Sequence, residues 1–250
     1  MHRNAQARQA LLQIIAATGL AACGGGGGSG SGPTLPPAPS VPPVFTTPTA
    51  LRVSEATPFA AGCLTVPEGS VIHANAEVEP HLAMDPADPN HLVAAWQQDR
   101  LSDGGARGLV TAVSVDGGTS WSGHQAAPFS ICAGGEFART SDPWVSIGGG
   151  TVVQVGIAFT GSALTSGARS AVLAARSVDG GFSWGPSIVL ADDDGSQYFH
   201  DKESVTIDPT DARYVYAVWD RLDPEGWGPT LLARSTDGGI SWAAPQVIYD

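Results

Sequence analysis

The eight residues Ser114-Val115-Asp116-Gly117-Gly118-Thr119-Ser120-Trp121 return twice, in nearly the same form, later in the chain. The copies are SVDGGFSW at residues 177–184 and STDGGISW at residues 235–242. The central aspartates of successive copies are 63 and 58 residues apart. Self-similarity at a nearly fixed period is the signature of a repeat architecture. The sequence therefore predicts a repeat protein with three repeats in this chain.

Each copy has the composition of a tight hairpin turn. An Asp followed by two glycines places a side-chain acceptor beside residues that tolerate positive φ, so Asp and Ser oxygens can accept hydrogen bonds from the turn's backbone N–H groups. Apolar runs precede the turns, and the Trp after each turn is placed to re-enter an apolar layer. The residues expected to have this structural role are Ser114, Asp116, Gly118, Trp121, Ser177, Asp179, Gly181, Trp184, Ser235, Asp237, Gly239 and Trp242.

A longer repeat surrounds each turn. An aromatic residue lies 11 residues after a turn residue in all three repeats, at Asp85 and Trp96, at Gly148 and Phe159, and at Asp208 and Trp219. On this alignment a first strand is expected near residues 80–84, 144–147 and 204–207, and a second near 92–96, 152–159 and 214–219. A third strand, the turn and a fourth strand follow. Because four antiparallel strands form the blade of a β-propeller, we expect an all-β propeller of such blades.

The composition supports this fold class and excludes some partners. The chain has 250 residues, of which 42% are hydrophobic, and its 32 glycines and 19 prolines punctuate short apolar runs, as in all-β proteins. The formal net charge is −12, and Lys202 is the single lysine in the sequence. Nucleic acids and anionic membrane surfaces require clustered Lys and Arg, so neither is expected as a partner.

The N-terminus predicts export and a lipid anchor. Residues 1–22 have a positive start and a short apolar core, as in a signal peptide. Leu20-Ala21-Ala22-Cys23 resembles the bacterial lipobox, which implies a lipid on Cys23 and a location on the outer face of a membrane of the bacterial cell envelope. An ordinary signal peptide followed by a coincidental Cys is the alternative. Residues 23–50 are rich in Gly, Ser and Pro and read as a tether, and residues 51–250 read as the folded domain.

The two remaining cysteines are candidates for a disulfide. An exported protein lies where disulfides persist, so Cys63 and Cys132 are expected to pair, with two unpaired buried thiols as the alternative. No His, Cys or Asp cluster has zinc spacing, and the acidic run 192–194 has no EF-hand pattern, so we expect no metal and no cofactor.

The octapeptides resemble the Asp-box, or BNR, repeat Ser-x-Asp-x-Gly-x-Thr-Trp of bacterial sialidases and related β-propellers, with Ser in place of the usual Thr at Ser120, Ser183 and Ser241. The resemblance implies a sialidase-like propeller, in which six blades close the ring. Three blades do not close a ring, and an open arc leaves blade faces and a strand edge uncovered. We therefore expect three blades of a longer propeller that is monomeric at its full length.

The resemblance extends to a glycan site in the first blade. In sialidases the second strand of this blade ends in an acidic residue and an arginine, and the loop after it carries an aspartate that acts as acid/base. Residues 93–105 (VAAWQQDRLSDGG) follow this order, which makes Arg100 the candidate substrate-binding arginine and Asp103 the candidate acid. A guanidinium binds a carboxylate through two hydrogen bonds, and a carboxylic acid in a partly closed pocket can protonate a leaving oxygen.

The chain departs from the family at two places. The Arg-Ile-Pro motif that opens the first blade of sialidases corresponds here to Val78-Glu79-Pro80, so its arginine is absent and Glu79 would repel a substrate carboxylate. The family's Tyr nucleophile and Glu partner lie late in its chains, beyond the position of Asp250. Glu203 is the acidic residue of this chain that we take as a second catalytic candidate.

Two further arginines are candidate substrate-binding residues. Arg139 enters the first strand of the second blade, and Arg221 ends the second strand of the third blade as Asp220-Arg221, which repeats Asp99-Arg100. A pair that recurs at the same point of two blades is also typical of a structural contact between strands or blades. That interpretation is the alternative for Arg221 and for Arg100.

Two functions remain open at this stage. The first is action on a glycan or glycoconjugate, either by exo-glycosidase hydrolysis of the sialidase type or by binding. The second is a non-catalytic protein-binding or assembly propeller, since Asp boxes occur in propellers without hydrolase activity and fold does not determine function. The missing Arg-Ile-Pro arginine favours the second.

Overall fold

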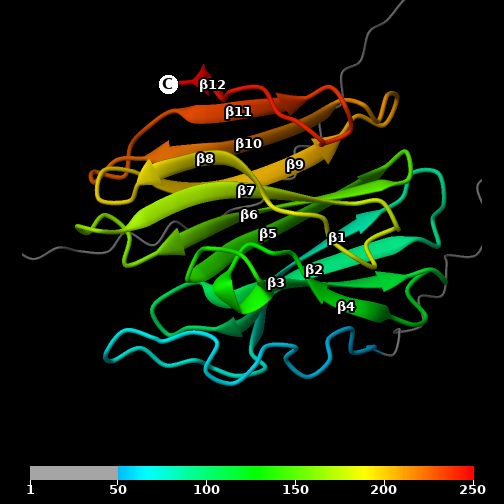
Figure 1. The fold of residues 1–250 in the computed structure, drawn as a ribbon. Helices are drawn as coiled ribbons and strands as arrows, with labels where there is room; N and C mark the ends of the chain where they lie inside the picture. The colour runs from blue at the N-terminus through cyan, green and yellow to red at the C-terminus, as the bar shows by residue number, and fades with distance from the viewer. Residues whose placement is uncertain (1–49) are drawn as a thin grey trace, which may run out of the picture. The chain divides into compact units, whose positions relative to one another are not determined.

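The computed structural model describes residues 50–250, so the predicted signal peptide, Cys23 and all but the last residue of the predicted tether lie outside the described residues. The described part contains twelve β-strands and one three-residue 3-10 helix, η1 (Ile131–Ala133) (Figure 1). No helix in it is long and apolar enough to cross a membrane. The predicted all-β class is confirmed.

The strands form three consecutive four-stranded antiparallel units, which we call blades 1 to 3. Blade 1 consists of β1 (Glu77–Met84), β2 (Leu92–Arg100), β3 (Ala106–Ser114) and β4 (Ser122–Ala126). Blade 2 consists of β5 (Arg139–Gly148), β6 (Thr151–Thr160), β7 (Arg169–Ser177) and β8 (Ile188–Asp194). Blade 3 consists of β9 (Phe199–Ile207), β10 (Val215–Leu222), β11 (Thr230–Ser235) and β12 (Gln246–Tyr249). A single bridge, between Ala106 and Thr140, joins blades 1 and 2 into one sheet.

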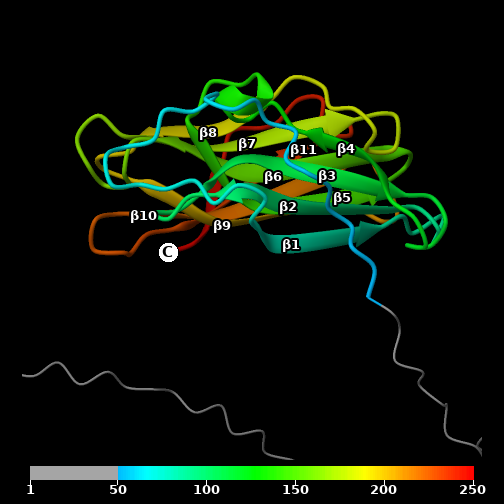
Figure 2. The ribbon, with the colours of Figure 1, turned by 90° about the horizontal axis from the view of Figure 1, so that it is seen from below.

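The blades pack face to face through apolar side chains. Nine of the ten residues of β6 are buried, because side chains on one face of this strand contact blade 1 and those on the other contact blade 3. The first layer contains Val93, Ala95, Val113, Val145, Ile147 and Val152, and the second contains Val153, Val155, Val205, Val215 and Trp219. The first strands of the blades, β1, β5 and β9, contact one another at the inner edge, and Figure 2 shows β1 and β9 on the side opposite β4 and β8.

The repeated octapeptides form hairpin turns that their side chains hold closed. Asp116 Oδ1 accepts hydrogen bonds from Ser120 N and Ser114 Oγ, both at 2.8 Å, and Ser114 Oγ accepts one from Gly118 N at 2.8 Å. Gly117 and Gly118 have φ of 71° and 87°, a conformation that favours glycine. The same bonds recur around Asp179 and Asp237. The hydrogen bonds predicted for the turns are therefore present.

The turns also join neighbouring blades. His91 of blade 1 lies with Nε2 2.8 Å from the Gly180 carbonyl oxygen in the second turn. Arg176 of blade 2 donates from Nε to the Gly238 carbonyl oxygen in the third turn, at 2.8 Å. Trp184 donates from Nε1 to Thr111 Oγ1 of blade 1 at 3.0 Å. The second and third hairpins thus fix their own blades and the position of the blade before each of them.

The alignment of the second repeat on Phe159 is wrong by three residues. Trp96, Gly156 and Trp219 are equivalent, because they pair with Val110, Leu173 and Leu231, each of which lies six residues before its turn aspartate. The connection β5–β6 has two residues, whereas β1–β2 and β9–β10 are each joined by seven. Because this connection is shorter, the 11-residue spacing that aligned Trp96 and Trp219 does not lead to the equivalent residue in blade 2.

The first strand of each blade is longer than predicted and contains a bulge. Glu79, Asp142 and Lys202 are equivalent and have φ of 53°, 52° and 55°, in the left-handed region that side chains other than glycine rarely adopt. The ladder register shifts at this point in all three blades. The strands predicted to begin at residues 80, 144 and 204 are therefore only the halves that follow the bulge.

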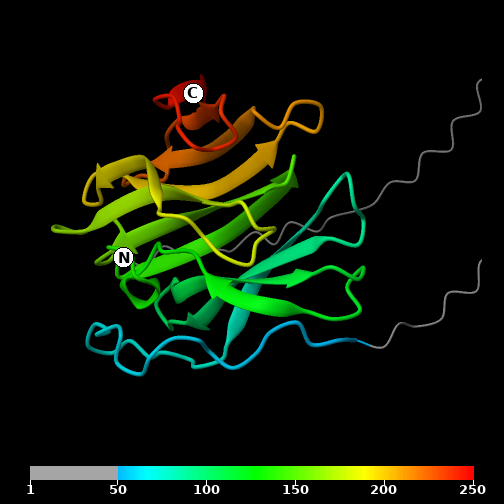
Figure 3. The same cartoon turned by 45° about the vertical axis from the view of Figure 1, so that its right-hand side comes forward.

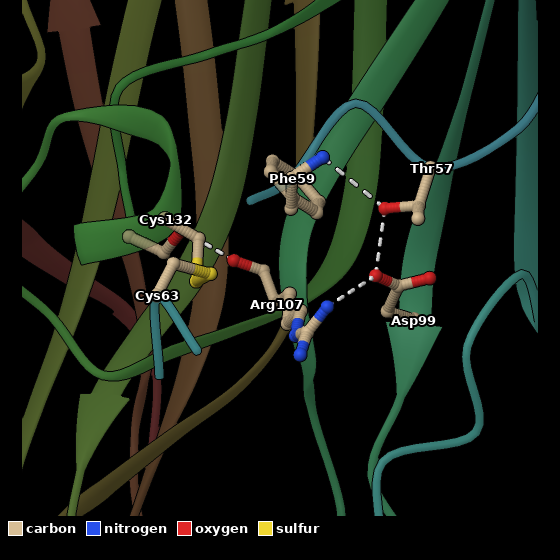
Figure 4. The surroundings of a disulfide bond; sticks show 7 residues. Thr57, Phe59, Cys63, Asp99, Arg107 and Cys132 are labelled. Carbon is tan, nitrogen blue, oxygen red and sulfur yellow. Dashed lines mark hydrogen bonds and ion pairs between the residues drawn. A yellow bond between two sulfur atoms is a disulfide. The ribbon is translucent and has the colours of Figure 1, made fainter. Parts of the chain in front are cut away.

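The segment that precedes β1 covers the outer face of blade 1 (Figure 3, blue to cyan). Phe59, which is 7% exposed, packs with Trp96, Val110 and Ala112 of the blade. The buried Asp99 carboxylate accepts hydrogen bonds from Thr57 Oγ1 at 2.7 Å and from Asn75 N at 2.7 Å, and pairs with Arg107 at 3.2 Å (Figure 4). The expected Cys63–Cys132 disulfide joins this segment to η1. The expectation of an uncovered face is therefore wrong for this side of blade 1.

We predict that removal of the disulfide destabilises blade 1. The bond closes a loop with a sequence separation of 69, and loss of a native disulfide costs about 2–4 kcal/mol. The double variant Cys63→Ser/Cys132→Ser should therefore unfold at a lower urea concentration than the parent, as should the parent with reductant. Two alkyl adducts on the unreduced parent, detected by mass spectrometry, would contradict the pairing.

We also predict that the turn aspartates make the free energy of unfolding depend on pH. Hydrogen bonds from the side chains of Ser183 and Ser177 lower the pKa of Asp179 from its usual 3.8 to about 2, and similar bonds lower the pKa of Asp116 and Asp237 to about 2. A carboxylate with a lowered pKa in the folded state contributes stability that is complete at neutral pH and is lost as the pH falls through about 4 to about 2.

The matching measurement is urea unfolding of the parent and of Asp179→Asn at about pH 7, 4 and 2.5. The variant should be less stable than the parent at neutral pH, and the difference should shrink in acid, because Asp179 of the unfolded parent binds a proton near its usual pKa of 3.8 before the folded carboxylate, with a pKa of about 2, does so. A difference that stays constant with pH would show that the carboxylate charge does not stabilise the turn.

Candidate functional site

Three of the predicted site residues line one pocket at the inner edge of the blades. Arg100 ends β2, Asp103 lies in the β2–β3 loop and Arg139 begins β5. Phe159 of β6 and Phe199 of β9 complete the wall of this pocket, whose volume is about 250 Å³. We call it the arginine pocket. It draws on all three blades, because the ends of β2, β5, β6 and β9 meet there.

Asp103 and Arg139 form an ion pair inside the arginine pocket. Arg139 is 3% exposed, and its Nη1 lies 3.0 Å from Asp103 Oδ1 and donates to the Gly104 carbonyl oxygen at 3.0 Å. The guanidinium carbon lies 5.8 Å from the centre of the Phe159 ring. A Cβ at Gly105 would lie 2.6 Å from Phe159, so only glycine allows this approach of the loop.

The ion pair determines the charge of Asp103. Desolvation by burial would raise the pKa of its carboxyl, but hydrogen bonds from Ser70 and Arg139, together with the Arg139 charge, bring that pKa below its usual value. Asp103 is therefore held as a carboxylate. This direction is opposite to the one that the sequence analysis assumed for a general acid at this position.

Arg100 is the arginine of this pocket with a free charge. It donates a hydrogen bond to Gln97 Oε1, and within residues 50–250 it has no ion pair with a carboxylate. The same Gln97 donates to Glu79 of β1 and to Ser141 Oγ of β5, so blades 1 and 2 are linked behind the pocket. Arg100 is thus available to bind an anionic or polar ligand group.

A second cavity, of about 470 Å³, lies next to the arginine pocket and shares Asp142 with it. We call it the axial cavity, because the bulge residues Glu79, Asp142 and Lys202 of all three blades line it. Burial and then the charge of Asp142 raise the pKa of Glu79, although Arg100 and Gln97 act in the other direction. Burial would also raise the pKa of Asp142, but hydrogen bonds from Ser141, Lys202 and Glu79 lower it.

The structure places Glu203 in the axial cavity and away from Arg100, Asp103 and Arg139. Glu203 is 3% exposed, and neither carboxyl oxygen has a hydrogen-bond partner among the described residues. Burial, followed by the charge of Asp142, raises the pKa of this carboxyl well above its usual value. Glu203 therefore favours the protonated form, which is the property expected of an acid rather than of a nucleophile.

Arg221 lies outside both cavities and has the structural contact that the sequence analysis kept as its alternative. Its Nε and Nη2 donate to the two Asp193 carboxylate oxygens at 2.6 Å and 2.9 Å, and its guanidinium carbon lies 3.5 Å from the centre of the Tyr198 ring. Asp193 belongs to β8, so the pair joins blade 2 to blade 3. The neighbouring Asp220 instead accepts a hydrogen bond from Thr230 Oγ1.

Sequence reasoning missed the aromatic and acidic residues that complete the two cavities. These are Phe159, Phe199, Asp142, Asp201, His81 and Trp144. One signal was available, since Glu79-Pro80 and Asp142-Pro143 both place an acidic residue before a proline at equivalent points of blades 1 and 2. The equivalent pair in blade 3 is Lys202-Glu203, which has neither the acidic residue first nor the proline second, so the pattern cannot be recognised from all three repeats.

Comparisons with known proteins support the fold. No protein family matches the chain, and no curated protein matches it in sequence. The structure of a Hadza microbial sialidase, Hz136, is similar to 68% of this chain with 16% identity and a TM-score of 0.52, and the similar region spans 37% of that sialidase. A Trypanosoma rangeli sialidase in complex with sialic acid matches 77% of this chain over 33% of its own chain, with 16% identity and a TM-score of 0.47. A Penicillium chrysogenum α-L-arabinanase matches 68% of this chain over 49% of its own chain, with 18% identity and a TM-score of 0.46. The chain thus has part of a sialidase-like β-propeller fold.

We predict that Arg221 contributes to stability and not to ligand binding. Arg221→Ala removes two charge-assisted hydrogen bonds between blades and should lower the free energy of unfolding by about 1–3 kcal/mol. Arg213→Ala is the matched control, because Arg213 also binds an aspartate, Asp211, through two nitrogens but is 72% exposed. Urea unfolding should show a smaller loss for the control. Equal losses would contradict a specific role for the contact between blades.

Proposed function

We propose that the protein acts on glycans, and that the arginine pocket is where the glycan binds. The observation that carries this proposal is the convergence of Arg100, Asp103 and Arg139 from two blades into one pocket beside two phenylalanine rings. We further propose that the protein is exported and held by a lipid on Cys23, so that its partner is a glycan or glycoconjugate outside the cytoplasm.

The chemistry of the pocket suits a sugar. Arg100 presents a guanidinium with free donors, which can bind a carboxylate or two neighbouring hydroxyls. The Asp103–Arg139 pair offers an acceptor and a donor whose positions are fixed by Ser70, Gly104 and each other. Pockets of this kind combine apolar walls with a few fixed polar groups that set the orientation of the ligand. The fold likeness to a sialidase supports the same class of ligand.

Most exo-glycosidases use one protonated and one ionised carboxyl group at the scissile bond, whereas sialidases use a Tyr as the nucleophile. Asp103 is held as a carboxylate, and Glu203 favours its protonated form. These directions make Asp103 the ionised carboxyl group of the arginine pocket, suited to a charged stabiliser or base, and Glu203 the protonated one of the neighbouring axial cavity, so we propose Glu203 as the acid only for a glycan that spans both cavities. The commitment of Asp103 to Arg139 is also the observation that favours the alternative, a binding propeller without catalysis.

We predict that Arg100→Ala weakens glycan binding by about tenfold or more, because it removes the free guanidinium of the pocket. The measurement is isothermal titration of the full-length protein with the ligands that it selects from a glycan array. Arg213→Ala, which removes an exposed arginine outside the pocket, should leave the affinity unchanged.

Turnover is tested with the same proteins on a panel of fluorogenic glycosides that includes sialosides. Fluorophore release that is lost in Asp103→Ala and in Arg100→Ala would establish a hydrolase, and binding without release would establish the non-catalytic form. Absence of binding to every glycan, or an Arg100→Ala variant that binds as the parent does, would overturn the proposal. A protein partner captured by the intact chain would then favour an assembly propeller.

A further inference from the structure

The axial cavity is a built feature and not a gap between blades. The bulge that lines it occurs at the same position in β1, β5 and β9, and it holds Glu79, Asp142 and Lys202 at positive φ. Backbone strain of this kind persists where the surrounding structure requires it, and it is common at binding sites. Here it brings three side chains together, since Lys202 Nζ lies 3.1 Å from Asp142 Oδ2, and Glu79 and Asp142 lie close enough in the same cavity for each to shift the pKa of the other.

Acidic groups outnumber basic ones around the cavity. Glu79, Asp142 and Glu203 line it, and Asp201 lies behind Lys202, whose Nζ is 3.8 Å from Asp201 Oδ1. Lys202 is the one ammonium group among the residues that line it, and it contacts Asp142 and Asp201 but not Glu79 or Glu203. The arrangement therefore already holds one ammonium and has acidic groups left for a second.

Glu203 is the observation that points to a ligand. Its equivalents in blades 1 and 2 are Pro80 and Pro143, so an apolar side chain can occupy this position of the fold. Blade 3 instead buries a carboxyl group with no hydrogen-bond partner among the described residues, which is unfavourable unless something compensates it. A cation bound in the cavity beside Glu203 would provide that compensation.

An aromatic surface lines the same cavity as these carboxyl groups. His81 and Trp144 also line the cavity, and their rings stack with centroids 4.0 Å apart. Val145 N donates to His81 Nδ1, and burial lowers the pKa of His81, so the imidazole is neutral and fixed in place. Trp144 remains 39% exposed. An indole beside carboxylates can accept both an ammonium group and the C–H face of a sugar ring.

We propose that the axial cavity binds the ammonium group of an aminated sugar, with Glu79 and Asp142 as its acceptors, Glu203 as a buried carboxyl group that ionises when the cation binds, and Trp144 as the surface for the ammonium group and the sugar ring. This inference rests on the proposed function, because Asp142 belongs to both cavities and a glycan bound at Arg100 would extend past it. It specifies the glycan class as one with a free amino group in place of an N-acetyl group.

The test compares two matched probes, the tetramer of glucosamine and the tetramer of N-acetylglucosamine, by isothermal titration of the full-length protein at about pH 6, where most of the amino groups are protonated. The aminated tetramer should bind about tenfold or more tightly than the acetylated one. Glu79→Gln, Glu203→Gln and Trp144→Ala should each reduce this preference. Glu136→Gln, which removes a 79% exposed acid outside both cavities, is the control and should leave it unchanged.

The three variants keep the test valid if one of them fails to fold, because Trp144 is partly exposed and its replacement removes no buried charge. Equal binding of the two tetramers, or a preference that survives both Glu79→Gln and Trp144→Ala, would overturn the inference. If neutral glycans bind in a manner that depends on Arg100 while the amino group gives no advantage, the inference fails and the proposed function stands. If no glycan binds, both fail.

Discussion

The structure depends on the requirement that both faces of the four-stranded sheets of blades 1 and 2 be covered. Blade 2 meets this requirement fully, because β6 is buried on one face by blade 1 and on the other by blade 3. The outer face of blade 1 is covered by Phe59 and its neighbours, and the Cys63–Cys132 disulfide and the Asp99 hydrogen bonds hold that cover in place. The second and third hairpin turns also hold neighbouring blades together, since the carbonyl oxygens of Gly180 and Gly238 each contact a side chain of the preceding blade. The blade ends that form the two cavities are therefore positioned by packing that lies outside the cavities.

At the inner edge of the blades, this regular apolar packing is replaced by charged side chains. In the layers between blades, successive side chains of a strand point to opposite faces of its sheet, and those in the layers are mainly apolar. At the bulge the alternation is interrupted, and acidic and basic side chains of three blades come within contact of one another. Because the bulge recurs, one local backbone feature produces a cavity that no single blade contains. The arginine pocket arises in the same way, from strand ends that are distant in sequence.

Local features of this molecule could be predicted from the sequence, and contacts between blades could not. The octapeptide turn is self-contained, so its hydrogen bonds follow from its own residues. The register of blade 2 failed because the landmark spacing assumed equal connections, and the two-residue turn at Gly149-Gly150 breaks that assumption. Resemblance to a family selected Arg100 and Asp103, and Arg139 was a further candidate, and the structure brings the three into one pocket. It could not show that Asp103 is paired with Arg139, because the partner belongs to the next blade and the pairing decides the charge of the carboxyl.

Glu203 shows why the repeat, which determines the fold, says little about the function. The fold accepts a proline at this position in two blades, and in the third it accepts a buried carboxyl group that reduces stability. The two choices are compatible with the same β-ladder, so nothing in the periodic pattern distinguishes them. What differs is the environment, because burial and the nearby Asp142 charge favour the protonated acid at Glu203, whereas hydrogen bonds favour the carboxylate at the turn aspartates. The turn aspartates, which serve the scaffold, thus have lowered pKa values and several hydrogen-bond donors. Glu203 has no hydrogen-bond donor among the described residues, and the fold does not need an acidic residue at its position. We therefore connect this residue, and not the turn aspartates, with a ligand.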